Sequence, residues 1–332
     1  MNLEHRGTTG AEPDTGDGAG VMLRRPDAFF EGVLDADLPD VYAVGSIFLP
    51  QDDAAREALQ ALVAEELDGR GVDVLEWRDV PTDASDLGAT AREAEPDVWQ
   101  VAVAPADGQS VEAFDTDLYV ARKRIEHRVD GSAEAEDAPA FEHPAVDEED
   151  ADRFYVCSLD RQTLVYKGLL KGEQVRSYYP DLTDERVAST FVMVHERFST
   201  NTLGAWHLAH PYRNIIHNGE FNTIRGNVNW MRAREADLES DRFDVDDVRP
   251  VIDDPEQSDT ASIDNSLELL MEAGRDLPHA LRTLVPEAWR GDDEMSAPRK
   301  AFYDYHASLV EPWDGPALVA ATDGERVGAV LD

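Results

Sequence analysis

Two segments of the chain combine side chains that could bind and activate a small polar ligand. In Glu196–Thr202, Arg197 precedes several small hydroxyl residues, and a guanidinium in that setting can hold a carboxylate with its planar fork of donors. In His217–Glu220, Asn218 and Gly219 follow an apolar run, and a side-chain amide beside a bare backbone N–H can donate to one oxyanion. Neighbouring strand ends could bring the two segments together, because paired strands lie only about 5 Å apart.

Both segments also have a purely structural interpretation. A strand-end arginine often forms a surface ion pair that contributes little to stability, and Asn-Gly after a strand is first of all a hairpin-turn signal. The apolar run Phe191–Val194 before Arg197, with the hydroxyls after it, favours the binding interpretation for the arginine.

Acidic and imidazole side chains nearby extend the candidate site. Asp259 precedes a helical pattern, where an acid usually caps the helix, and Asp264 is a second acid in the same stretch. His210 stands before a proline and could shape a pocket, whereas His217 fits a hydrogen-bonded structural histidine better.

A glycine-rich segment close to the start invites comparison with a phosphate-binding loop. The segments Leu3–Ala11 and Thr15–Gly20 are rich in small residues that allow close backbone approach. Neither contains the Gly-Lys-Ser/Thr or Gly-x-Gly-x-x-Gly pattern of such loops. We therefore expect structural turns beside a site.

The composition indicates a globular protein with an extremely acidic surface. The chain has 332 residues, 42% of them apolar, and carries 70 acidic against 30 basic residues for a net charge of −40. This charge argues against binding to nucleic acid or to an anionic membrane, and no apolar run or signal-peptide pattern indicates a span or a leader. Acids spread along the chain, with only four lysines, are typical of a protein from a high-salt cytoplasm, where the Debye length falls to about 3 Å at 1 M.

Cys157 is the only cysteine in the sequence. A single cysteine excludes an internal disulfide and any cysteine-rich zinc or iron–sulfur site, and no metal site is expected. Because Cys157 lies in an apolar alternating run, we expect a buried structural thiol rather than a nucleophile.

The periodicity of apolar residues predicts strands clustered between helices, which indicates two packed sheets with flanking helices or an α+β domain. An acidic segment at about 130–152, with ten acids and no Lys or Arg, is expected to be a solvated loop. The expected strands are 40–49, 98–103, 154–159, 163–167, 190–195, 214–217, 317–321 and 327–331, and the expected helices are 52–67, 118–127, 227–238, 262–273, 278–284 and 298–309.

The order of these segments resembles the glutaminase domain of class II glutamine amidotransferases. The stretch that reaches Arg234-Glu235, and the later runs Glu287–Trp289 and Tyr305–Pro316, are similar to the large subunit of glutamate synthase in particular. The resemblance spans Leu3–Asp332 except for the acidic run, and it is weakest between about 52 and 118. It implies an α+β fold, a four-layer αββα sandwich of the amino-terminal-nucleophile (Ntn) hydrolase type, in which an amino-terminal strand is missing. Residues 1–332 would form one partial amidotransferase domain.

The resemblance also implies roles for individual residues. Arg197 would bind the α-carboxylate of glutamine and Asp259 its α-amino group, with Asp264 as the alternative acid. Asn218 and Gly219 would form the oxyanion hole. Arg197, Asn218, Gly219 and Asp259 are expected to line one pocket. Thr200 and His210 are the further candidates for substrate binding.

The family nucleophile, a cysteine at the mature amino terminus, has no counterpart in this sequence. The chain is therefore interpreted as a fragment or split-gene product of an enzyme of glutamate biosynthesis and nitrogen assimilation. It would be active only with the missing cysteine, and the alternative is a noncatalytic glutamine-binding or partner-docking remnant. FMN and an iron–sulfur cluster are expected in the missing synthase part, and the partners would be glutamine and the remaining synthase domains or a split-gene partner.

Overall fold

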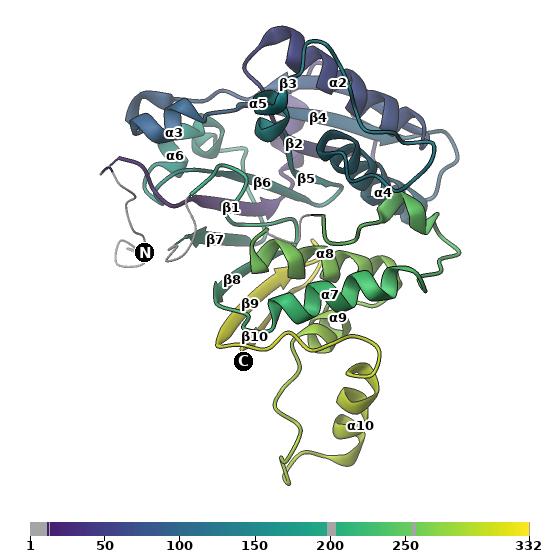
Figure 1. Ribbon diagram of the computed structural model, residues 1–332. Coiled ribbons are helices and arrows are strands. Elements are labelled where there is room, and N and C mark those ends of the chain that lie inside the picture. The colour runs from purple at the N-terminus through teal and green to yellow at the C-terminus, as the bar shows by residue number, and fades with distance from the viewer. Residues whose placement is uncertain (1–11, 13, 198–203, 254–256, 332) are drawn as a thin grey trace. The chain divides into compact units, whose positions relative to one another are not determined.

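The computed structural model describes residues 12, 14–197, 204–253 and 257–331, and it divides the chain into two compact units. The first unit is Met1–Arg213 and the second is Asn214–Asp332. All paired strands in the described residues run antiparallel, with helices between them (Figure 1). This mixed arrangement confirms the α+β part of the prediction, whereas the four-layer sandwich and the missing strand remain predictions.

The first unit contains two antiparallel sheets. The larger sheet has the order β3 (Val72–Asp79), β4 (Asp97–Pro105), β2 (Ala43–Leu49) and β5 (Tyr155–Asp160). The smaller sheet has the order β6 (Thr163–Gly168), β1 (Ala19–Arg24) and β7 (Val192–Glu196). A short turn between β5 and β6 takes the chain from one sheet to the other.

Helices of the first unit begin and end at residues suited to those positions. The Asp52 side chain caps α2 by accepting from two backbone N–H groups, and Ser110 caps α4. Gly131 ends α4 in a left-handed conformation, with φ of 75°. The elements are α1 (Asp27–Val33), α2 (Asp53–Asp68), η1 (Ala84–Asp86), α3 (Ala89–Glu93), α4 (Val111–Asp130), α5 (Glu148–Arg153), α6 (Val175–Tyr178) and η2 (Pro180–Thr183).

The first unit is built in layers around a core between α2, α4 and the larger sheet. Leu59 and Leu62 of α2 pack with Leu118 of α4 against Val101 and Val103 of β4, and all five are buried. The opposite face of the larger sheet meets the smaller sheet, where the Gln100 amide donates to the Tyr166 hydroxyl. A helical layer, a sheet and a second sheet therefore follow one another within this unit.

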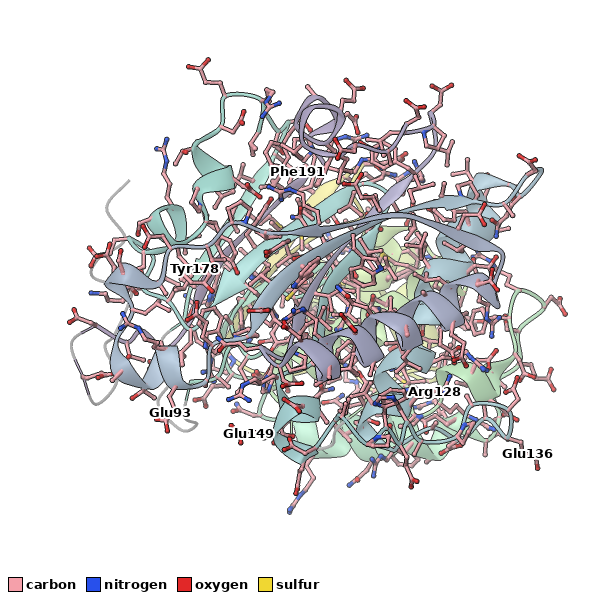
Figure 2. The ribbon with its side chains drawn as sticks, turned by 90° about the horizontal axis from the view of Figure 1, so that it is seen from above. Glu93, Arg128, Glu136, Glu149, Tyr178 and Phe191 are labelled. Atoms are coloured by element: carbon pink, nitrogen blue, oxygen red, sulfur yellow. The ribbon has the colours of Figure 1, made fainter. Side chains whose placement is uncertain are left out.

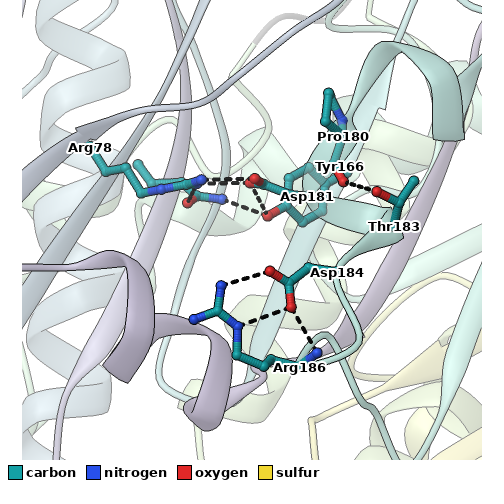
Figure 3. Close-up of polar contacts among 8 residues, drawn as sticks. Arg78, Tyr166, Pro180, Asp181, Thr183, Asp184 and Arg186 are labelled. Carbon is teal, nitrogen blue, oxygen red and sulfur yellow. Dashed lines mark hydrogen bonds and ion pairs between the residues drawn. The ribbon is translucent and has the colours of Figure 1, made fainter.

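A buried polar network joins the two sheets of the first unit (Figure 3). Arg78 of β3 donates to both carboxylate oxygens of Asp181 at 2.8 and 2.7 Å and to Gln100 of β4 at 2.8 Å. The Tyr166 hydroxyl of β6 donates to Asp181 at 3.0 Å. Because each charged group has several partners, the network can be buried without an unpaired charge.

The second unit consists of one small sheet with helices, and Figure 1 shows its strands β9 and β10 in yellow beside β8. Ser258 caps α8 through a bond from the Ala261 N–H, and Asp276 caps α9. The sheet order is β10 (Val327–Leu331), β9 (Ala317–Thr322) and β8 (Ile215–Gly219). The helices are α7 (Ile224–Glu235), η3 (Val245–Val248), α8 (Asp259–Glu272), α9 (Leu277–Leu284) and α10 (Ala297–His306).

Three expectations about local structure need correction. Residues 19 and 20, expected in a turn, begin strand β1, where a Cβ on Gly20 would lie only 2.6 Å from the backbone oxygens of Tyr166 and His210. The acidic segment is not loop throughout: residue 130 ends α4, and a capping box at Asp147 and Asp150 starts α5. Helix α8 begins at Asp259 rather than at residue 262, since the cap is Ser258.

Charged side chains of the first unit divide into an acidic exterior and paired interior groups. Figure 2 shows Glu93, Glu136 and Glu149 at the outer edge of the ribbon, and all three are exposed. Two of the four lysines, Lys123 and Lys167, are 1% and 0% exposed. No helix among the described residues is long and apolar enough to cross a membrane.

Replacing Arg78 by leucine is expected to lower the free energy of unfolding by about 3–5 kcal/mol, because Asp181 would remain as a buried, uncompensated charge. The matched control is Arg186→Leu, which breaks the pair with Asp184 near the surface, where the side chains are 43% and 28% exposed. Urea unfolding followed by fluorescence measures both variants. Equal losses in the two variants would contradict the importance assigned to the buried network.

The net charge of −40 predicts that salt stabilises the folded chain. Repulsion among surface carboxylates opposes the compact state, and added salt screens that repulsion. Thermal melts in 0.1 M and in 2 M KCl should therefore show a higher midpoint in the more concentrated salt. An unchanged or lower midpoint would reject this explanation of the composition.

Candidate functional site

The end of β8 presents the predicted oxyanion-hole residues to solvent. Along the strand, Ile215 and His217 are buried while Asn218 and Gly219 are exposed. The register with β9 pairs Asn218 with Leu318 and Gly219 with Ala317, so the last residues of β8 still belong to the sheet. The Asn218 amide is therefore carried by a fixed strand and not by a free loop.

Gly219 is required by the backbone geometry at this strand end. Its φ is +120°, a conformation that residues with a Cβ rarely adopt. A Cβ built on Gly219 would lie 2.0 Å from the backbone oxygen of Pro316. The close approach leaves room for glycine alone, and it holds the end of β8 against the start of β9.

Asp259 joins the beginning of α8 to the segment that follows β8. Its Oδ2 accepts from the Phe221 backbone N–H at 3.1 Å, and its Oδ1 accepts from the Thr260 N–H at 2.8 Å. The carboxylate lies in the first turn of the helix, where the helix dipole favours a negative charge. The Asp259 side chain remains 25% exposed, so a ligand can reach it.

His217 lies beneath this carboxylate in a buried, mostly apolar environment. Its Nδ1 is 3.0 Å from the Thr260 hydroxyl, and its ring stacks on Phe221 with centroids 4.7 Å apart. Burial lowers the pKa of His217, and the nearby Asp259 charge opposes this shift only in part. A neutral, hydrogen-bonded imidazole agrees with the structural role predicted for this residue.

Asp264, the alternative to Asp259, lies one and a half turns farther along α8. It is completely buried and accepts from the backbone N–H of Asn214 at 3.0 Å. A carboxylate in this position supports the entry into β8 and is closed to a ligand from solvent.

Arg197, in the first unit, follows directly after β7 and is bound to the segment that precedes β1. Its backbone N–H donates to the Gly18 oxygen at 2.7 Å, and its guanidinium donates to the Asp17 oxygen at 3.3 Å. The residue is 9% exposed. Since Arg197 belongs to the first unit and Asp259 to the second, their convergence on one pocket remains a prediction.

His210 is packed within the first unit. It is 5% exposed, its ring stacks on that of His195 with centroids 4.2 Å apart, and its backbone oxygen covers Gly20. A Cβ on Gly20 would lie 2.6 Å from that oxygen, which explains the small residues at the start of β1. The role of His210 in shaping a pocket remains a prediction, and Thr200 lies outside the described residues.

Cys157 is buried in the middle of β5 with 1% of its surface exposed. Burial raises the pKa of its thiol to about 12, so the thiolate is scarce at neutral pH. The expectation of a buried thiol is confirmed.

Sequence reasoning missed two contributors to the second-unit site. Thr260 stands between His217 and Asp259, and the Phe221 N–H fixes the Asp259 carboxylate. No pattern in the sequence predicts either contact. Each joins residues about forty positions apart, and their pairing depends on the packing of α8 against β8.

The described strands and helices form an α+β protein with an exposed amide at the end of β8 and a partly exposed carboxylate at the start of α8. A family model described as "Glutamine amidotransferases class-II" matches residues 1–332. The chain therefore belongs to the class II glutamine amidotransferase family.

The chain is also similar to glutamate synthases from three organisms. The chain is 42% identical to the glutamate synthase [NADPH] large chain of Bacillus subtilis and 43% identical to the glutamate synthase [NADH] of Schizosaccharomyces pombe. It is 40% identical to the ferredoxin-dependent glutamate synthase 2 of Arabidopsis thaliana. The similarity covers at least 99% of this chain but only 21%, 15% and 20% of the three relatives. The chain thus spans about a fifth or less of their length.

Replacing Gly219 by alanine is expected to destabilise the second unit by at least about 1–3 kcal/mol, because alanine must adopt a strained φ and meets the Pro316 oxygen. The control is Gly226→Ala in α7, where a Cβ meets nothing within 4 Å. That control should gain about 0.5–1 kcal/mol from helix propensity. Calorimetric melts of both variants test the prediction, which fails if Gly219→Ala melts like the unaltered chain.

Proposed function

We propose that this chain is the glutamine-binding part of a glutamate synthase, in which glutamine is hydrolysed to glutamate and ammonia for transfer to 2-oxoglutarate. Asp259 carries the proposal: its carboxylate is partly exposed and is fixed by two backbone N–H groups, one of them from Phe221, two residues beyond the end of the strand that carries the exposed Asn218 and Gly219. Family membership and the glutamate synthase relatives support the same function.

In this proposal the α-carboxylate and the α-ammonium group of glutamine are each bound by one side chain. Arg197 binds the α-carboxylate through its planar guanidinium, and Asp259 binds the α-ammonium group. The complete burial of Asp264 supports the choice of Asp259 between the two acids. Thr200 and His210 complete the binding pocket, and the required convergence of the two units is part of the proposal.

The reaction is acyl transfer from the carboxamide of glutamine. A cysteine thiolate attacks the carboxamide carbon, and the Asn218 amide and Gly219 N–H stabilise the oxyanion of the tetrahedral intermediate. The nucleophile's own α-amine, which has taken up the thiol proton, passes that proton to the amide nitrogen, so that the C–N bond breaks and ammonia leaves a thioester. Water then hydrolyses the thioester to glutamate and restores the thiol. This chain supplies the clamp and the oxyanion hole, while the nucleophile comes from a residue other than Cys157.

A noncatalytic role is the alternative, and the position of Cys157 favours it for the chain on its own. The only thiol of the sequence is buried in β5 with a raised pKa. A chain in this state could bind glutamine, or dock to a partner, without hydrolysing it.

The remaining parts of the proposal concern the larger assembly. The other synthase domains, or a split-gene partner, would receive the ammonia, and they would hold FMN and an iron–sulfur cluster. The described residues do not fit such a cluster: they contain no group of three or more His, Cys, Asp or Glu placed to hold a metal. We further propose an Ntn-type four-layer sandwich lacking an amino-terminal strand, and a high-salt cytoplasm as the setting.

The purified chain is expected to release negligible ammonia from glutamine, whereas a version extended to a family-type amino-terminal cysteine should be active. Loss of the nucleophile lowers turnover by orders of magnitude. Cys157→Ala in the extended version is the control and should retain activity, because that thiol is buried.

A coupled ammonia assay in molar KCl measures all three proteins. Equal turnover by the short and extended chains would show that the added cysteine is not the nucleophile. Loss of activity in the Cys157→Ala variant would assign that role to Cys157.

A further inference from the structure

A chain of hydrogen bonds links three side chains of the second unit. His217 Nδ1 lies 3.0 Å from the Thr260 hydroxyl, which lies 3.3 Å from Oδ1 of Asp259. His217 and Thr260 are 4% and 1% exposed. Water therefore cannot easily replace either bond, and the loss of one partner would leave a buried polar group unsatisfied.

The donor and acceptor capacities of these groups determine the direction of the chain. An ionised carboxylate only accepts, and a hydroxyl carries a single proton. If the Thr260 hydroxyl donates to Asp259, its oxygen must accept from a proton on Nδ1 of His217. Nε2 of His217 is then the bare nitrogen, and it is buried with no hydrogen-bond partner among the described residues. The other tautomer would bury an unpaired N–H there and would take the Thr260 proton away from Asp259.

The His217 ring can orient the Asp259 carboxylate through Thr260 without forming a direct ion pair with it. The Asp259 Oδ2 atom is 3.8 Å from Nδ1, too far for a hydrogen bond. Burial lowers the pKa of His217, which keeps the ring neutral near pH 7. In the part of the chain that the structure describes, no arginine or lysine pairs with Asp259. Its negative charge therefore stays available to a cationic ligand.

The same histidine is adjacent to Asn218 on β8. Side chains alternate along a strand, so His217 points inward to α8 while Asn218 points to the opposite face. A displacement of the buried ring would move the backbone that carries the Asn218 amide. His217 thereby connects the carboxylate to the strand end.

We propose that His217 and Thr260 are positioning residues that orient Asp259 for the α-ammonium group of an amino-acid ligand and couple it to the strand that carries Asn218. This inference rests on the proposed function, because it takes Asp259 as the ammonium ligand. It adds a specificity role for two residues that do not touch the ligand. Selectivity for ligands with an α-ammonium group should depend on the hydrogen-bond relay from His217 through Thr260 to Asp259.

The test compares two ligands that differ only in that group. L-Glutamine has the α-ammonium group, whereas glutaramic acid keeps the carboxylate and the carboxamide but lacks it. Isothermal titration calorimetry of the chain in molar KCl gives both affinities. The matched variants are Thr260→Val, which has the same shape without the hydroxyl, and Thr260→Ser, which keeps it.

Thr260→Val is expected to weaken glutamine binding about tenfold, as for a lost hydrogen bond to a charged group, with glutaramic acid binding unchanged. Thr260→Ser should bind both ligands like the unaltered chain. His217→Leu should behave like Thr260→Val, and His217→Asn should retain the preference, since its amide can donate from the position of Nδ1.

Nitrogen-15 NMR of labelled histidine provides a readout that is independent of binding. The His217 signal, assigned by its absence in His217→Asn, should report a neutral ring with the proton on Nδ1, and it should shift in Thr260→Val. A proton on Nε2, or a signal unaffected by Thr260→Val, overturns the relay.

The binding outcomes separate the inference from the proposed function. An equal loss for both ligands in Thr260→Val indicates a merely structural residue and overturns the inference, as does a glutamine preference that survives this substitution. An unaltered chain that binds both ligands equally, or neither, contradicts the proposed function and the inference with it.

Discussion

The close contact between Gly219 and the start of β9 is the constraint on which the candidate site depends. Only a residue without a Cβ can place its backbone against Pro316 at this φ. With that contact in place, the β8–β9 register is fixed and alternation determines the rest: His217 faces α8, and Asn218 faces solvent. A strand end with a freer register could present either residue, because a shift of one position exchanges the two faces.

The first unit satisfies a different requirement, since it buries charged side chains in a protein with 70 acidic against 30 basic residues. Its interior cations are held by specific partners: Arg78 by Asp181, and Lys167 by the His207 backbone oxygen and the rings of Tyr155 and Tyr212. Such pairs add little net stability compared with apolar packing but are costly to break. They therefore favour one arrangement of the two sheets over alternatives that would separate the partners.

Sequence patterns predicted best those elements in which apolar residues recur regularly and a capping residue marks the end. Helix α2 follows an Asp cap and repeats its leucines on one face, so the prediction of 52–67 misses each end by one residue. Strand β2 is mostly apolar and ends where predicted, at Leu49, but it begins at Ala43 rather than at residue 40. Strand β1 was missed because it begins with Ala19 and Gly20, which look like turn residues until the chain that covers them is known. In the site, family motifs pointed to Asp259 and Asn218. Thr260 could not be predicted, because its hydrogen bond to His217 spans 43 positions and depends on how α8 packs on β8.

The burial of two of the four lysines has a practical consequence for chemical labelling. Lys123 and Lys167 are shielded inside the first unit, which leaves Lys171 and Lys300 as the accessible side-chain amines. One lies just after β6 and the other in α10, so each unit carries a single accessible lysine. An amine-directed dye or crosslinker would thus attach at two side-chain positions, one in each half of the chain, and could report the distance between the halves without any engineered cysteine.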